Sequence, residues 1–257
     1  MNARRGLLCG LVLGLAVAAF NPLTASAQLA THRQSVASPG WAAPWPAYPE
    51  HPFGIGQWVY VAPIPPAGPA QLPTTGYVYG LSFVTEGASG VIGLSSDAEG
   101  PIAGIKMAAS SPNPSLATIR YDWSPGKFYF LLAYHLGNGL WAGWVYDNAA
   151  SAWTPIGAVQ SPTAGHLSLL SVNTLYGARG APTTGFAQDG ADTEQPCRAF
   201  PRVDAYFYPP VHFWQSTFAL STMGGGFGFG SGDCLTEATR EFDWVHVRLG
   251  SPAGAAG

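Results

Sequence analysis

Charged residues are scarce in this sequence. Asp, Glu, Lys and Arg make up 10% of the chain, whereas an average soluble domain has about 25%. Lys and Arg number 11 against 14 Asp and Glu, and the formal net charge is -3. A chain so poor in positive charge lacks the basic surface that attracts nucleic acid or an anionic membrane. Nucleic acid is therefore excluded as an expected partner.

Long apolar runs are also missing, apart from one near the N-terminus. Leu7 to Phe20 form a run of about 14 residues, shorter than the roughly 20 that span a bilayer. Arg4 and Arg5 precede this run and Ala25-Ser26-Ala27 follows it, as in a cleavable secretory signal. We therefore expect a signal peptide over residues 1–27, a secreted mature protein (extracellular or periplasmic) and no membrane span after cleavage. An uncleaved membrane anchor is the alternative.

Cysteine is rare as well, with three in the chain. Cys9 lies inside the predicted signal and precedes most of the apolar run, whereas a lipoprotein is acylated on a cysteine at the cleavage point. Removal of the signal leaves Cys197 and Cys234. An even number of cysteines in an exported chain predicts one disulfide, with two free thiols as the alternative. The sequence has no Cys-x-x-Cys spacing and no cluster of His residues, so a zinc site is not expected. No cofactor is expected either.

Proline and aromatic residues are abundant instead. Residues 28–75 are rich in Pro and Trp, which predicts an extended arm without regular structure, apart from a first strand over Gln57–Ala62. A flexible linker is the alternative for this arm. A β-sandwich domain is expected over residues 76–250, followed by a flexible tail over residues 251–257.

Short apolar or alternating runs dominate the chain from Tyr77 onward. They recur about every 8 to 12 residues between Gly, Pro, Asn and Ser, which is typical of an antiparallel β-sandwich or barrel. No window shows a helical period, and Asn138-Gly139 favours a tight hairpin turn. The fold class expected is all-β, an antiparallel jelly-roll (concanavalin/lectin-like) β-sandwich. The predicted strands are Tyr77–Val84, Val91–Leu94, Ile102–Met107, Thr118–Tyr121, Lys127–Leu136, Leu140–Tyr146, Leu167–Val172, Val203–Tyr208, Phe213–Leu220 and Phe242–Leu249.

The order of motifs in the central stretch carries a resemblance. Tyr79-Gly80-Leu81-Ser82-Phe83-Val84 is followed by Gly90-Val91-Ile92-Gly93-Leu94, by Tyr121 to Phe130, by Trp141 to Asp147 and by Trp153-Thr154-Pro155-Ile156-Gly157. Over roughly residues 76 to 250 this order resembles a family of secreted bacterial proteins catalogued only as a domain of unknown function. The resemblance implies a concanavalin-like jelly-roll sandwich and carries no established activity. A glycine-rich turn that the family places before Tyr121 is absent here, where Ser110 to Pro114 stand instead.

Motifs for catalysis are weak, so no catalytic residue is predicted, and whether the chain is an enzyme stays open, with a non-catalytic role favoured. Glycoside hydrolysis needs two carboxylates on facing surfaces, and the candidates are Glu86, Asp122 and Glu241. Gly-x-Ser-x-Gly does not occur, and His135, His166, His212 and His246 stand in separate strands without metal-ligand spacing. Asp189, Asp192 and Glu194 could bind calcium, although a solvated acidic loop is favoured, and no metal is predicted.

Aromatic residues are the most informative feature. Period 2 along Leu140–Tyr146 places Trp144 and Tyr146 on one face and Trp141 on the other. Sugar rings stack on exposed aromatic rings while carboxylates bond their hydroxyls, which predicts a carbohydrate site at Trp123, Trp141, Trp144, Tyr146 and Asp122.

The main hypothesis is accordingly a secreted lectin-like protein that binds glycan or cell-envelope polymer without catalysis. A secreted glycoside hydrolase or polysaccharide lyase on the same fold is one alternative, and a structural envelope protein is another. The oligomeric state stays open.

Overall fold

The strands of this protein form two antiparallel sheets. The computed structural model describes residues 40–45, 52–63, 77–97, 99–108, 115–162, 165–178, 203–214, 217–220, 227–229, 235–241 and 243–250. All of these residues belong to the unit Arg33–Gly257, and over these ranges the chain is all-β. A search of the same ranges finds no helix with the length and apolarity needed to cross a membrane.

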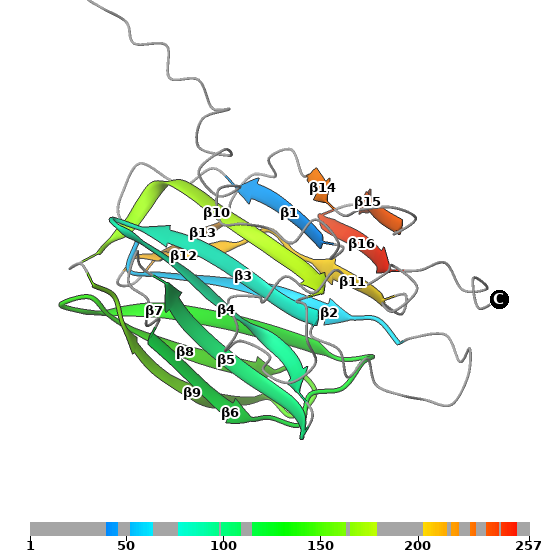
Figure 1. The fold of residues 1–257 in the computed structure, drawn as a ribbon, viewed down its shortest axis with the longest axis horizontal. Coiled ribbons are helices and arrows are strands. Elements are labelled where there is room, and N and C mark those ends of the chain that lie inside the picture. The colour runs from blue at the N-terminus through cyan, green and yellow to red at the C-terminus, as the bar shows by residue number, and fades with distance from the viewer. Residues whose placement is uncertain are drawn as a thin grey trace, which may run out of the picture. The chain divides into compact units, whose positions relative to one another are not determined.

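Sheet A and sheet B lie one over the other in Figure 1. The strand order in sheet A is β14 (Phe227–Phe229), β1 (Gly40–Trp45), β10 (Leu167–Ala178), β3 (Tyr77–Thr85), β4 (Ala88–Asp97), β5 (Gly100–Ala108) and β6 (Ser115–Arg120). The order in sheet B is β15 (Leu235–Glu241), β16 (Trp244–Gly250), β11 (Val203–Phe207), β2 (Gly54–Val61), β7 (Phe128–Gly137), β8 (Leu140–Asp147) and β9 (Ala152–Gln160). Beside this path, β12 (Val211–Trp214) pairs with β2 and with β13 (Thr217–Leu220).

The expected all-β antiparallel sandwich is confirmed at this level. Strands β3 to β6 pair in sequence order in sheet A, and β7 to β9 do so in sheet B. Asn138 and Gly139 join β7 to β8 with φ values of 52° and 74°, the left-handed backbone that this turn was expected to adopt. The finer assignment to a jelly roll stays a prediction.

The structure corrects the expected elements in several places, and strands β14 and β15 were not among the predicted strands. Strand β1 lies within the arm that was expected to lack regular structure, and pairs with β10. The run Phe213–Leu220 is divided between the paired strands β12 and β13. Strand β9 was not predicted because Pro155 and Gly157 interrupt its pattern. Both are tolerated because β9 is an edge strand with a bulge opposite β8, and Gly157 has a φ of 139°.

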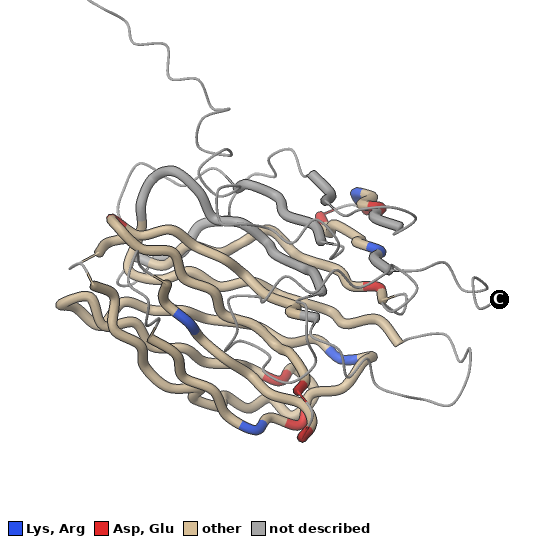
Figure 2. The backbone as a smooth tube through the Cα atoms, in the orientation of Figure 1, with Lys and Arg blue, Asp and Glu red and all other residues tan. Residues whose placement is uncertain are grey.

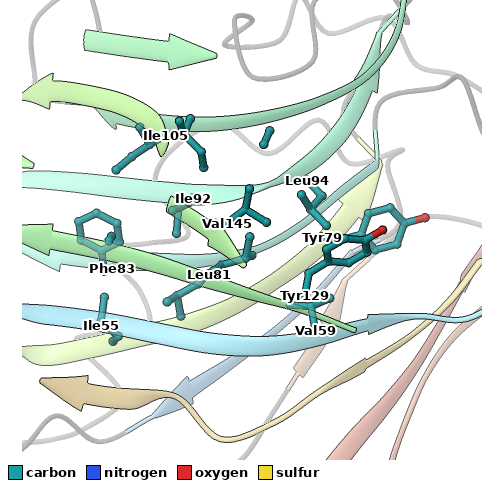
Figure 3. Packing of buried hydrophobic residues seen from close by; sticks show 14 of the residues in the cluster. Ile55, Val59, Tyr79, Leu81, Phe83, Ile92, Leu94, Ile105, Tyr129 and Val145 are labelled. Carbon is teal, nitrogen blue, oxygen red and sulfur yellow. The ribbon is translucent and has the colours of Figure 1, made fainter. Parts of the chain in front are cut away.

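Aliphatic and aromatic side chains from both sheets fill the space between them (Figure 3). Their period of two along each strand follows from the alternation of side chains across a sheet. Phe83, Leu81 and Ile92 come from sheet A, and Val59 and Leu131 come from sheet B. Because this face of each sheet is covered by the other, these side chains are removed from water, which is the main source of stability in such a domain.

Candidate functional site

The side of sheet B that faces away from the core carries a continuous set of rings. In β2 the core side chains Val59 and Val61 alternate with Trp58 and Tyr60, which point outward and are partly exposed. Other strands of sheet B, β7, β8, β9, β11, β12 and β16, bring further rings to this side. We call the set the aromatic face; its members are Trp58, Tyr60, Phe128, Phe130, Tyr146, Trp153, Tyr206, Tyr208, Phe213 and Trp244.

Strand register builds the first row of this face. Trp58 stands opposite Phe130, Phe130 opposite Tyr146, and Tyr146 opposite Trp153, on four neighbouring strands. Ring centroids are 5.1 Å apart for Trp58 and Phe130, and 5.1 Å apart for Tyr146 and Trp153. Cross-strand aromatic pairs of this kind stabilise a sheet and hold each ring in place.

A second row runs two residues along the same strands and ends at a histidine. Phe128, Tyr60 and Tyr206 are in register, with centroid distances of 4.6 Å and 5.8 Å between successive rings. Tyr206 then stands opposite His246 of β16, and the two rings stack at 4.0 Å with an angle of 12°. Trp244 is on β16 with His246, and its ring centroid lies 5.6 Å from that of Phe128, at the other end of the row. The rings of β7 and β16 therefore belong to one surface.

Two glycines of β2 leave room for rings on the outward side of sheet B. A Cβ atom on Gly56 would lie 2.3 Å from Cζ of Phe130, and one on Gly54 would lie 2.5 Å from Cδ2 of Tyr134. Real Cβ atoms do not approach other atoms so closely, so Phe130 occupies space that only a glycine provides. The rings are therefore packed down onto the sheet rather than standing free of it.

Two carboxylates flank His246 at the end of the second row. Its Nδ1 lies 3.1 Å from Oε1 of Glu241, and its Nε2 lies 3.8 Å from Oδ2 of Asp204. Because an ionised carboxylate only accepts hydrogen bonds, Nδ1 donates to Glu241. We call Asp204, His246 and Glu241 the acid–histidine cluster.

Members of the acid–histidine cluster differ in their access to solvent. The His246 side chain is 5% exposed, whereas that of Glu241 is 46% exposed. Nε2 of His246 is buried and makes no hydrogen bond. A molecule arriving from solvent therefore meets the carboxylate of Glu241 and not the imidazole behind it.

Other polar groups border the acid–histidine cluster. Burial, together with the negative charges of Glu241 and Asp204, raises the pKa of the Tyr206 phenol. Arg248 Nη2 lies 3.5 Å from Nδ1 of His246, and Arg248 Nη1 lies 3.5 Å from Glu237. In Figure 2 most of the described residues are tan, and segments of both charge signs lie at β15 and β16.

The residues of the predicted carbohydrate site fall into three environments. Trp123 and Trp141 are buried in the core, where Nε1 of Trp123 donates to the Ser95 carbonyl at 2.7 Å. Trp144 and Tyr146 share one face of β8, as the alternation predicted, and the structure shows that this face points outward from sheet B. Asp122 is exposed in the segment after β6 of sheet A. The prediction is wrong for Trp123 and Trp141, because a ring inside the core cannot meet a ligand.

The three candidate carboxylates lie on separate elements. Glu86 is in the turn between β3 and β4, Asp122 follows β6, and Glu241 ends β15 at the edge of sheet B. Glu241 is joined instead by Asp204 and Tyr206, which the sequence did not single out. In the sequence, the short spacing between Glu241 and His246 was the one sign of the acid–histidine cluster. Asp204 is far from both in the sequence and approaches them through the pairing of β11 with β16.

Several predicted features fall outside the described residues. These are the signal peptide over residues 1–27, the cysteines Cys197 and Cys234, the tail over residues 251–257 and the acidic loop with Asp189, Asp192 and Glu194. Within the described ranges, no group of three or more His, Cys, Asp or Glu residues is arranged to hold a metal ion.

Comparison with known proteins gives structural neighbours only. No protein-family model and no curated protein matches the sequence. Scytalido-glutamic peptidase with a transition state analog inhibitor matches with 7% identity and a TM-score of 0.49, over 81% of this chain and 97% of that chain. SCP-B, a member of the eqolisin family of peptidases in complex with the tripeptide Ala-Ile-His, matches with 6% identity and a TM-score of 0.44, over 82% and 97%. The native heptameric SAP-like pentraxin from Limulus polyphemus matches with 10% identity and a TM-score of 0.27, over 77% and 91%. Likenesses at this level assign neither a family nor an activity.

The hypothesis of a lectin-like, non-catalytic protein for glycan or cell-envelope polymer is wrong. Two of the four rings on which that hypothesis depended, Trp123 and Trp141, are core residues.

Proposed function

We propose that this chain is a hydrolase in which Glu241 is the general base and His246 holds it in position. The observation that supports the proposal is a half-exposed carboxylate whose oxygen accepts a hydrogen bond from a buried histidine. A general base must reach the proton that it removes, and in the acid–histidine cluster only Glu241 reaches solvent to that extent. With the export signal proposed for residues 1–27, the substrate is met outside the cell.

Amide hydrolysis suits this arrangement better than glycoside hydrolysis. Glycosidases place the bond to be cleaved between two carboxylates. Here the imidazole of His246 fills the space between Glu241 and Asp204, so a sugar linkage cannot enter between them. A single base acting on water needs no second carboxylate across the bond.

The proposed step transfers one proton through Glu241. Its carboxylate takes a proton from water while the water oxygen bonds to the carbonyl carbon of the substrate. The protonated Glu241 then gives that proton to the leaving nitrogen as the C–N bond breaks, which yields a carboxylic acid and an amine. The hydrogen bond from His246 fixes the orientation of the carboxylate, and Asp204 faces the other side of the imidazole ring.

A direct test compares the Glu241→Gln variant with a variant of a neighbouring acid. Fluorescein-labelled casein is incubated with the purified protein and its cleavage is measured over pH 4 to 8. We expect cleavage by the wild type, and a loss of about 100-fold or more in Glu241→Gln because general base catalysis contributes at least that factor. Asp243→Asn, which alters an exposed acid of the same hairpin, serves as the matched control and should retain the activity. Equal activity in Glu241→Gln and Asp243→Asn, or none in the wild type, would overturn the proposal.

A further inference from the structure

We propose that the substrate is a polypeptide that crosses the aromatic face at right angles to the strands, with Trp153 as the specificity-determining residue at its far end. This inference rests on the proposed function and adds the course, the minimum length and the side-chain preference of the substrate. Three observations support it: the position of Trp153, the spacing of the strands and the sign of the charge near Glu241.

Trp153 is the most accessible ring of the aromatic face. Its side chain is 51% exposed, although it lies on the edge strand β9 with Tyr146 at 5.1 Å and Phe130 at 6.1 Å. Contacts on two sides hold the indole in one place while leaving part of it open to solvent. A ring fixed in this way loses little conformational freedom when an apolar side chain packs on it.

Strand spacing sets the length of the substrate. The Glu241 side chain reaches from β15 to His246 of β16, so the distance is counted from β16. From there to β9 the strand order is β16, β11, β2, β7, β8 and β9. Five spacings of about 4.8 Å give roughly 24 Å between the two ends. An extended polypeptide advances about 3.3 Å per residue, so about seven residues separate the cleaved bond from the side chain that meets Trp153.

Charge at the other end favours a basic residue in the substrate. On the outward side of β11, β15 and β16, the carboxylates Asp204, Glu237 and Glu241 lie near one guanidinium, that of Arg248. A ring beside these carboxylates, that of Trp244, also attracts a cation through its π face. The surface is therefore complementary to a polypeptide with a Lys or Arg near the cleaved bond and an aromatic residue about seven positions away.

Binding measured without cleavage tests this inference. Two synthetic nonapeptides carry Lys at position 1 and Gly or Ser elsewhere, except that one has Phe at position 8. Calorimetric titration into the Glu241→Gln protein should give about tenfold tighter binding for the Phe peptide, since an aromatic contact is worth up to about 1.5 kcal/mol. Adding Trp153→Ala should remove that difference. Adding Leu116→Ala, which truncates an exposed apolar residue of sheet A, should leave it unchanged.

The outcomes that contradict this inference are distinct from those that contradict the hydrolase. The absence of binding, a Phe preference that survives Trp153→Ala, or an equal gain from Phe at position 4 would each overturn the assigned substrate path. Casein cleavage that depends on Glu241 would stand in all of those cases. If Phe-dependent binding is present and wild-type casein cleavage is absent, the path holds and the hydrolase fails.

Discussion

The two sides of sheet B are built from the same strands and are both rich in apolar residues, yet they differ in kind. The inward side presents Val59, Leu131 and Val145, which are fully buried. The outward side presents Trp58, Phe130 and Tyr146 at the neighbouring positions, and their rings contact one another across the strands. Aliphatic side chains fill a closed interior, whereas the large rings support one another on a surface that no described strand covers. An apolar side chain on a strand therefore does not by itself identify the core.

The largest expected effect separates two tryptophans on opposite sides of sheet B. Trp141 is 0% exposed and packs on Phe83 at 5.0 Å, so Trp141→Ala should lower the free energy of unfolding by about 3–5 kcal/mol. Trp153→Ala, on the aromatic face, should lower it by less than about 1 kcal/mol. Urea unfolding followed by circular dichroism measures both. Equal losses would mean that the aromatic face is part of the core.

Acid pH should weaken the inward side through His212. Burial lowers the pKa of His212 to about 4, below its ordinary value near 6.5, so the folded protein holds this imidazole neutral. As pH falls from 6.5 toward 4, the unfolded chain binds a proton that the folded chain does not. The free energy of unfolding therefore decreases, by about 3 kcal/mol over that window.

The measurement for His212 is a difference between two proteins. Urea midpoints are determined at pH 7 and pH 4.5 for the wild type and for His212→Gln, so that the titration of other groups cancels. The variant should lose less stability over this interval than the wild type does. Parallel pH profiles would show that water reaches His212 in the folded protein.

A methyl group on the outward side should disturb the aromatic face while sparing the core. Gly56→Ala places a Cβ atom in the space of the Phe130 ring and 2.9 Å from the Leu131 carbonyl oxygen. Displacing this ring should lower the free energy of unfolding by about 1–3 kcal/mol, as overpacking does. NMR shifts of Trp58 and Tyr146 should change, whereas those of the buried Leu81 and Ile92 methyl groups should not. Equal changes in both sets would show that the two sides of sheet B are not independent.

The smallest expected effect concerns charges that belong to neither side. Arg120 donates to Asp97 and Glu99 at the turn between β4 and β5, and its hydrogen bond is the main cause that lowers the pKa of Asp97. Exposed ion pairs contribute little because solvent screens them, so Arg120→Ala should leave the urea midpoint nearly unchanged at pH 7. A shift as large as that of Gly56→Ala would show that this turn contributes to the packing of the sheets.

Local pattern was enough to predict most of the strands. The hairpin of β7 and β8 was predicted because both strands are apolar and Asn138-Gly139 between them tolerates positive φ. Strand β9 was missed because Pro155 and Gly157 resemble a loop until the edge position of the strand is known. Strand β1 was missed because its proline-rich sequence fits a strand only once β10 lies beside it.

The sequence by itself determined that this protein is an all-β chain with little charge, and it determined which residues of each strand share a face. Only the tertiary structure decided that Trp141 is core and Trp153 is surface, and that Asp204, His246 and Glu241 lie together. The physical reason is that alternation assigns side chains to two faces without stating which face another sheet will cover. The acid–histidine cluster depends in addition on the register between β11 and β16, which no local pattern encodes.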